Sequence, residues 1–218
     1  MTHQLRQSAV AIDQIFADTW LTVARLKRGL PINNGEEFYR QACQQVEQAR
    51  SRLQDAGYSR TDIEHMLYAQ CALLDESVMN RNERDAGYQQ WLKSPLQATY
   101  FNTLEAGAQL WDRVATVLHD NSASQAVLVC FHRVLLLGFS GQHRDSGSQH
   151  RLSTLEQLGQ RVPAYALTAG STLTVAATAG FNKRTRYLLG WLIAGAGLLA
   201  LWWFLSNSLQ GLLQQLLS

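Results

Sequence analysis

The sequence predicts an all-α protein, with a helical domain followed by one C-terminal transmembrane helix. Apolar residues recur at three- and four-residue steps over most of the chain, which is the periodicity of amphipathic helices. Only three prolines interrupt the 218 residues. From Tyr187 to Leu205, 19 consecutive residues include no Asp, Glu, Lys, Arg or His. As a helix they would be roughly 28 Å long, enough to cross the hydrocarbon core of a bilayer.

These observations divide the chain into four segments. We expect a helical domain over 1–163, a linker and basic flank over 164–186, a transmembrane helix over 187–206 and a short tail over 207–218. Small and Thr residues without clear periodicity fill 164–182, so a flexible linker and an ordered extension are both open there.

The first two expected helices are amphipathic. The first runs over about 8–28 and ends at Gly29. The second runs over about 36–53, behind a cap at Asn34 and with Gly57 beyond its end. Because each carries one apolar face, we expect the two helices to pack together.

A third helix is expected to form the centre of the domain. It begins near Ser59 or Thr61, and Thr61 with Glu64 has the spacing of a capping box. Its middle, within 63–80, is apolar nearly all round, which is typical of a buried central helix. The polar stretch 81–93 is expected to be a connection.

Beyond this connection, Pro95 is expected at the first helical position behind a cap at Ser94. Apolar residues form a stripe over 96–104 and continue over 110–118, with a bend or a break at Gly107. The stretch 125–137 is almost as apolar as the anchor. Since it is too short to span a membrane, we expect it to be buried. A last short helix follows over 151–162.

The sequence GFSG at 138–141 resembles part of the GxSxG nucleophile elbow of hydrolases. That elbow needs a glycine where Gln142 stands and a strand before the serine, whereas a helix is expected here. We instead expect Gly138 to end the buried helix in a left-handed cap, Phe139 to fold back onto the bundle and Gly141 to allow a second tight turn.

Asp75 and Glu76 are unusual because they lie in the C-terminal third of the most apolar helix, where the helix dipole disfavours carboxylates. Three roles are open: a structural pair that accepts hydrogen bonds from a neighbouring loop, a docking site for a partner, and catalysis. Adjacent helical residues point about 100° apart, which makes a shared catalytic cavity difficult. Candidate counter-ions are Arg81, Arg84 and Arg144.

Metal, redox and nucleic-acid functions have little support. The three cysteines, Cys43, Cys71 and Cys130, lie far apart within apolar helical patterns, as buried cysteines do in a reducing compartment. Neither they nor the six histidines show the short spacing of a metal site, so we expect no metal and no cofactor. The folded part contains no basic stripe with interleaved aromatic residues, so nucleic acid is not an expected partner.

The flanks of the apolar segment predict its orientation. Lys183, Arg184 and Arg186 precede it and no charged residue follows it, so the domain should be cytoplasmic and the C-terminus periplasmic. Small residues spaced four apart either let a second helix approach closely or face lipid. They are Gly190, Ala194, Ala196 and Ala200.

Three segments before this anchor, CALLDESVMN, QQWLKSPLQATYFNTLEAGAQLW and LLLGFSGQHR, together resemble the DotU/TssL family of type VI secretion inner-membrane proteins. The resemblance covers most of 10–160 plus the anchor. It implies a cytoplasmic hook of two small helical bundles held in the bacterial inner membrane. It also implies a scaffold that binds itself, an IcmF-like partner (TssM) and the baseplate of the contractile tail, with the lipoprotein TssJ joined through TssM.

The resemblance also assigns site residues. The family's acidic pair falls on Asp75 and Glu76. The residues of its glycine turn are Gly138, Phe139, Gly141 and Arg144. The alternative is a membrane-tethered enzyme or signalling adaptor that uses the cleft between two bundles.

Overall fold

The computed structural model describes residues 2–103, 106–141 and 148–163. The chain divides into two compact units, Met1–Ala166 and Leu167–Ser218. The predicted transmembrane segment belongs to the second unit and lies outside the described residues. None of the described helices is long and apolar enough to cross a membrane.

The described part of the first unit consists of helices and their connections, which confirms the all-α class. The helices are α1 (Thr2–Ile15), α2 (Ala17–Lys27), α3 (Gly35–Asp55), α4 (Arg60–Met79), α5 (Ala86–Lys93), α6 (Leu96–Phe101), α7 (Ala106–His119), α8 (Gln125–Leu136) and α9 (Ser148–Arg161). They share one hydrophobic core. A hook of two bundles stays a prediction.

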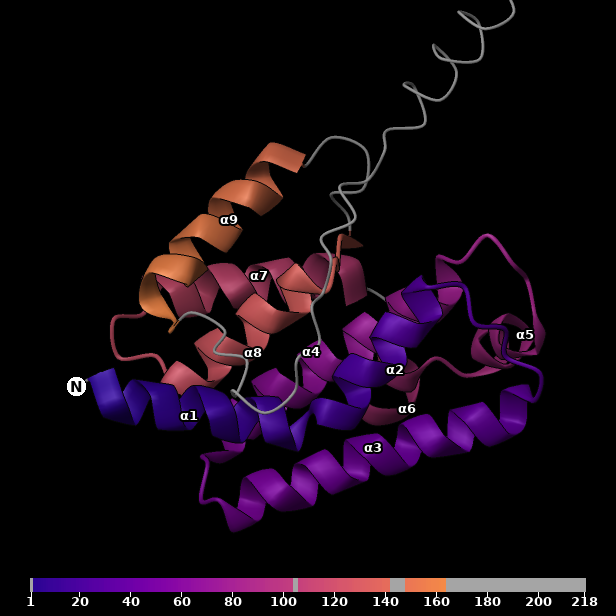
Figure 1. The fold of residues 1–218 in the computed structure, drawn as a ribbon, viewed down its shortest axis with the longest axis horizontal. Coiled ribbons are helices and arrows are strands. Elements are labelled where there is room, and N and C mark those ends of the chain that lie inside the picture. The colour runs from indigo at the N-terminus through magenta and orange to yellow at the C-terminus, as the bar shows by residue number, and fades with distance from the viewer. Residues whose placement is uncertain (1, 104–105, 142–147, 164–218) are drawn as a thin grey trace, which may run out of the picture. The chain divides into compact units, whose positions relative to one another are not determined.

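Helix α4 lies at the centre of this unit, as its apolar sequence predicts (Figure 1). It contacts α2, α3, α5, α6, α7 and α8, and ten consecutive residues from Met66 to Asp75 are buried. Because the middle of α4 is covered on all sides, its burial contributes to the packing of most of the other helices.

The single helix predicted over 8–28 is wrong, since the chain turns at Phe16 into α1 and α2. The hydrogen bonds from Phe16 N–H to Ile12 O, at 3.1 Å, and from Trp20 N–H to Phe16 O, at 2.9 Å, continue across the turn. The bend has a packing reason. It lets α1 lie against α8 and α2 lie against α4, with the ring of Phe16 fully buried between them.

Helix α3 begins where its cap predicts. The side chain of Asn34 accepts a hydrogen bond from Glu37 N–H at 3.1 Å, and Gly57 beyond the end has a φ of +77°. The predicted packing against α1 and α2 is present, while α3 also contacts α4 and α5.

Helix α4 is capped by Ser59, whose hydroxyl accepts a hydrogen bond from Asp62 N–H at 3.1 Å. The capping box proposed for Thr61 and Glu64 is wrong. Glu64 instead forms an ion pair with Arg113 of α7 at 3.1 Å.

The predicted polar connection over 81–93 contains α5, which the sequence analysis missed. Asp85 caps this helix by accepting Tyr88 N–H at 3.1 Å and also accepts Ile32 N–H at 2.9 Å. Trp91 is fully buried against the aromatic rings of α3. Tertiary contacts therefore determine this short helix more than its own apolar pattern does.

The prediction that Pro95 is the first helical residue of α6 is wrong, because Pro95 is the N-cap of this helix. The Ser94 hydroxyl does not cap α6, because it lies against the hydroxyls of Tyr39 and Thr99. The break before α7 comes at Asn102, which adopts a left-handed conformation with a φ of 52°. Gly107 lies inside the first turn of α7.

Helix α8 is buried along most of its length, as its apolar sequence predicts. Helix α9 packs on α8 and begins at Ser148, three residues earlier than expected. In α9, Leu158 is buried, whereas Leu152 is 63% exposed and does not belong to the core.

Candidate functional site

Asp75 caps the N-terminus of α6 from α4. Its carboxylate accepts hydrogen bonds from the backbone N–H groups of Leu96 and Gln97, each at 2.9 Å, and from the indole N–H of Trp91 at 2.8 Å. This contact compensates for Pro95, whose side chain has no oxygen to accept these bonds.

Asp75 is only 7% exposed. Burial raises the pKa of its carboxyl to about 6, although the three hydrogen bonds lower it in part. No Lys or Arg of the described residues bonds to it, so N–H dipoles alone stabilise the charge. A group buried in this way is not itself a contact surface for a partner.

Glu76 holds the turn that follows α8. Its carboxylate oxygens accept hydrogen bonds from Ser140 N–H, at 2.9 and 3.2 Å, and from Gly141 N–H, at 2.7 Å. The two acids therefore bind different segments, as expected for adjacent helical residues that point about 100° apart. These are the contacts of a structural pair, and they do not test the docking alternative.

The turn itself starts with a left-handed helix cap at Gly138, which has a φ of +89°. Gly138 N–H bonds to Leu135 O at 3.0 Å, and Phe139 N–H bonds to Val134 O at 3.2 Å, which is the pattern of a Schellman cap. The ring of Phe139 folds back onto the bundle and is 1% exposed. The chain is thereby directed toward Glu76.

Gly141 forms the second part of the turn, with a φ of +56°. A Cβ at this position would collide with the backbone of Gly107, so glycine is required both by conformation and by space. The indole N–H of Trp111 donates to Ser140 O at 3.0 Å and holds the turn from its other side. Arg144, the fourth residue predicted for the turn, lies outside the described residues.

Neither described candidate counter-ion reaches the acidic pair. Arg81 donates to Asp85 Oδ2 at 2.8 Å and to Leu30 O at 2.7 Å, which joins the α2–α3 and α4–α5 connections. Arg84 lies over the ring of Tyr88, 5.6 Å from its centroid. The third candidate, Arg144, is not described.

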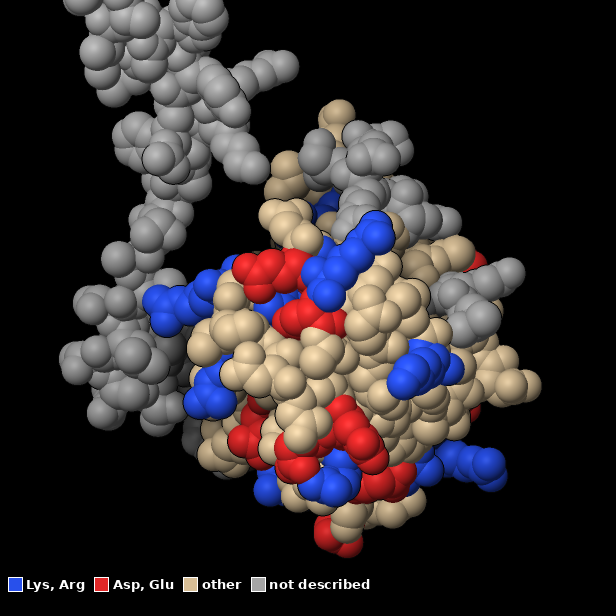
Figure 2. Space-filling model, turned by 90° about the vertical axis from the view of Figure 1, so that its right-hand side faces the viewer, with Lys and Arg blue, Asp and Glu red and all other residues tan. Residues whose placement is uncertain are grey.

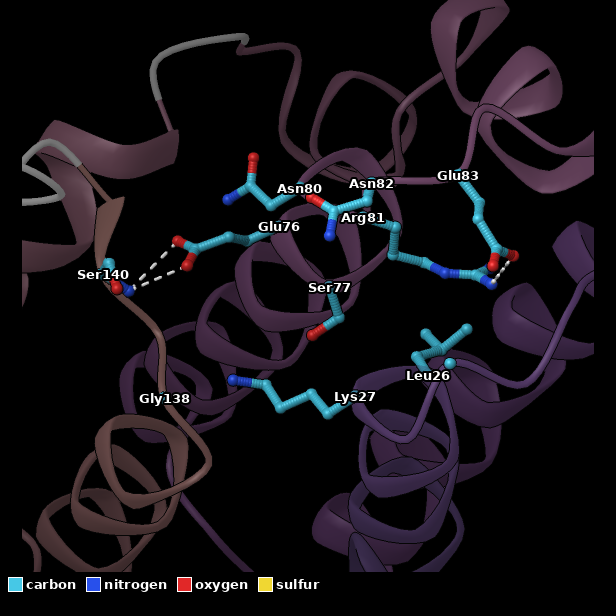
Figure 3. A pocket seen from close by; sticks show the side chains of 11 residues that line it. Leu26, Lys27, Glu76, Ser77, Asn80, Arg81, Asn82, Glu83, Gly138 and Ser140 are labelled. Atoms are coloured by element: carbon cyan, nitrogen blue, oxygen red, sulfur yellow. Dashed lines mark hydrogen bonds and ion pairs between the residues drawn. The ribbon is translucent and has the colours of Figure 1, made fainter. Parts of the chain in front are cut away.

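A pocket of about 400 Å³ opens beside Glu76, where the C-terminal ends of α2 and α4 meet the turn after α8 (Figure 3). Glu76 points toward Ser140, and Arg81 points toward Glu83, so both charged groups are engaged at the pocket walls. The lining residues are Leu26, Lys27, Gly29, Glu76, Ser77, Asn80, Arg81, Asn82, Glu83, Gly138 and Ser140.

Two donors in this pocket have no bonded partner within the described part of the chain. The Oγ of Ser77 is buried and makes no hydrogen bond. The ammonium of Lys27 lies over Gly138, where a Cβ would collide with it, and forms no ion pair. Burial lowers the pKa of Lys27, the Glu76 carboxylate opposes this shift and the Arg151 guanidinium adds to it.

Neither Lys27 nor Ser77 is predicted from the sequence as a site residue. Lys27 reads as an ordinary cation in the last turn of a helix, and Ser77 as a small residue in an apolar helix. Their separation by 50 positions hides the fact that they share a pocket. The only sequence signal is that Ser77 directly follows the acidic pair.

Metal chemistry would need a cluster of ligating side chains, and nucleic-acid binding would need a basic stripe. Across residues 2–103, 106–141 and 148–163, no three His, Cys, Asp or Glu side chains are placed to hold a metal ion. On the face seen in Figure 2, acidic and basic side chains lie among one another and form no continuous basic stripe. The basic flank at Lys183, Arg184 and Arg186 lies outside the described residues, as do the small residues of the predicted span.

Comparison with known families gives one match that covers most of the chain. A family model described as "Type VI secretion system protein DotU" matches residues 11–208. No curated protein matches the chain.

Solved structures show the same relationship. The chain is 43% identical to SciP/TssL from Escherichia coli Enteroaggregative 042, with 78% of this chain and 98% of that chain covered and a TM-score of 0.64. The cytoplasmic domain of TssL from Acinetobacter baumannii is 23% identical, with 69% and 95% covered and a TM-score of 0.64. TssL from Vibrio cholerae is 25% identical, with 66% and 94% covered and a TM-score of 0.54.

Proposed function

The chain belongs to the DotU family of type VI secretion system proteins, and on this premise we propose that it is a scaffold of the secretion membrane complex. The observation that carries the proposal is the family match over 11–208, together with 43% identity to a TssL over 78% of the chain. Members of this family are structural components of the secretion system and not enzymes. The alternative of a membrane-tethered enzyme is therefore set aside.

The scaffold would connect the membrane to the contractile tail. Its proposed partners are an IcmF-like TssM in the inner membrane, the cytoplasmic baseplate, a second copy of the chain, and TssJ indirectly through TssM. Membership of the family supports partners within the secretion complex. A hook of two helical bundles would be the form in which the domain meets them.

We place the helical domain in the cytoplasm and the C-terminus in the periplasm. The uncharged stretch from Tyr187 to Leu205 and the basic residues before it support a single-pass anchor with this orientation. The relative from Acinetobacter baumannii is described as a cytoplasmic domain, which agrees with this placement.

Within the domain, we propose that a partner docks at the pocket beside Glu76. Glu76 lines this pocket, whereas Asp75 is buried beneath the surface. Asp75 would therefore support docking indirectly, by keeping α6 in place against α4. The open volume at the junction of α2, α4 and the turn after α8 supports this location.

The scaffold role can be tested with the full chain, tagged at its N-terminus and extracted from bacterial membranes in mild detergent. We expect TssM and baseplate proteins to co-purify with it. A matched control carries Lys183, Arg184 and Arg186 changed to Glu, which should disturb membrane orientation. Purification of the unaltered chain without any secretion component would contradict the proposal.

Orientation and self-association need separate tests. Protease added outside intact spheroplasts should leave the helical domain uncut, and digestion would show that the orientation is wrong.

Replacement of Gly190, Ala194, Ala196 and Ala200 by Leu should weaken self-association in membranes if these residues pack against a second helix. Unchanged association would mean that they face lipid.

A further inference from the structure

The pocket beside Glu76 has an unexpected balance of hydrogen-bonding groups. An acidic pair suggests a basic guest, but both carboxylates are already engaged. Asp75 accepts three N–H groups and is buried. Glu76 accepts the N–H groups of Ser140 and Gly141. A basic ligand would have to compete with the backbone N–H groups of Ser140 and Gly141 for Glu76.

Ser77 and Lys27 are two donors of the pocket that have no bonded partner among the described residues. Ser77 is 9% exposed, and its Oγ has no partner among the described residues. Figure 3 shows the Ser77 hydroxyl and the ammonium end of Lys27 facing the same space. A buried hydroxyl without a hydrogen-bond partner is costly, and an acceptor placed in this space would remove that cost.

Two neighbouring charges act on Lys27. The Glu76 carboxylate favours the charged ammonium, and the Arg151 guanidinium opposes it with a smaller effect. At the other end of the pocket, Arg81 is paired with Glu83 at 3.6 Å and with Asp85 at 2.8 Å. Lys27 is therefore the cation of the pocket that has no ion-pair partner in the described chain.

We infer that this pocket receives a carboxylate, the side chain of an Asp or Glu on a partner protein, which accepts hydrogen bonds from Lys27 and Ser77. The inference rests on the proposed scaffold function and names the chemistry of its docking site. In this arrangement Asp75 and Glu76 of α4 hold the segments around the pocket in place. Lys27 of α2 supplies the positive charge that contacts the partner's carboxylate.

Zero-length carbodiimide cross-linking tests this contact directly, because it joins a lysine amine to a carboxylate that touches it. We would treat the full chain with its co-purified partners in detergent and identify cross-linked peptides by mass spectrometry. We expect a link between Lys27 and an Asp or Glu of a baseplate protein. A link from Lys27 only to Glu76 of the same chain, or no link at Lys27, would overturn the inference.

Substitutions separate charge from reactivity. Lys27→Arg should keep partner binding and lose the cross-link, since a guanidinium donates hydrogen bonds but does not couple. Lys27→Gln should weaken binding by about tenfold or more, and Ser77→Ala by a few-fold. Lys93→Gln, at the end of α5 and outside the pocket, is the matched control and should change neither.

The two proposals fail in different ways. Equal binding by the unaltered chain, Lys27→Gln and Ser77→Ala would refute the carboxylate contact and leave the scaffold role standing. Absence of every secretion partner from the unaltered chain would refute the scaffold role, and the contact would fall with it. Circular dichroism melting of each variant would show whether weaker binding reflects unfolding. We expect Lys27→Gln to melt near the unaltered protein, because Lys27 has no partner in the described fold.

Discussion

Arg133 of α8 and Asp13 of α1 form an ion pair, with Arg133 Nε 3.1 Å from Asp13 Oδ1, although they lie 120 positions apart in the sequence. The Arg133 side chain is 4% exposed and that of Asp13 is 20% exposed. The pair therefore joins α1 to the buried helix α8, and it does not involve the acidic pair of α4.

The change Asp13→Ala should destabilise the domain strongly, because it leaves the Arg133 charge buried without its carboxylate. We expect a loss of about 3 kcal/mol in the free energy of unfolding, measured by urea denaturation. The double change Asp13→Leu with Arg133→Met removes both charges and should cost less than the single change. A double variant as unstable as the single one would show that the ion pair itself is needed.

Asp75→Asn should loosen the start of α6, because an amide presents one accepting oxygen where the carboxylate presents two. One N–H group of Leu96 or Gln97 would then face an N–H₂ group. We expect a loss of about 1 to 3 kcal/mol in the free energy of unfolding and faster hydrogen exchange at these two amides. Exchange at Ser140 and Gly141 is the internal control and should not change.

The pKa of Asp75 also predicts a pH dependence. Its folded-state pKa of about 6 lies above the ordinary 3.8. Between these two pH values, a larger fraction of Asp75 is therefore protonated in the folded state than in the unfolded state. The Asp75 contribution to stability should therefore rise as pH falls through 6. From pH 7 to pH 5 the unaltered protein should gain about 1 kcal/mol relative to Asp75→Asn. A constant difference between the two proteins would contradict the raised pKa.

Glu76→Gln makes the corresponding test for the turn. Gly141 N–H would lose its acceptor if the amide oxygen stays with Ser140, at a cost of about 1 to 3 kcal/mol. We expect faster hydrogen exchange at Ser140 and Gly141 and unchanged exchange at Leu96. Loss of partner binding without any change in exchange or melting would instead assign Glu76 to docking alone.

Gly35→Ala should be more damaging than Gly57→Ala. A Cβ on Gly35 would collide with the backbone carbonyl of Ala86, and backbone in two packed helices cannot easily move away. We expect a loss of about 3 kcal/mol, the upper end for overpacking. Gly57 has a φ of +77° but open space around it, so its change should cost about 1 to 2 kcal/mol. Similar melting temperatures for the two variants would contradict this ranking.

Local signals predicted those features that depend on neighbouring residues. The cap at Asn34, the ends marked by Gly57 and Gly138, and the burial of α4 and α8 all follow from short sequence patterns. The bend at Phe16 was not predictable in this way. It arises because α1 and α2 pack on different helices, and apolar periodicity continues straight through it.

The site was less predictable because its parts come from distant positions. Asp75 replaces a cap that Pro95 cannot provide, and this is visible only once α4 and α6 lie together. Helix α5 likewise depends on Asp85 bonding to Ile32 and on Trp91 entering the core. The acidic pair itself stood out in the sequence, while its hydrogen-bond partners could not be identified from it.

Two neighbouring carboxylates on α4 grip segments that are 21 and 64 positions further along the chain. A force that a docked partner exerts on α4 would therefore be transmitted both to α6 and to the turn after α8. Under force, the domain should unfold cooperatively in one step, and single helices should not detach before it.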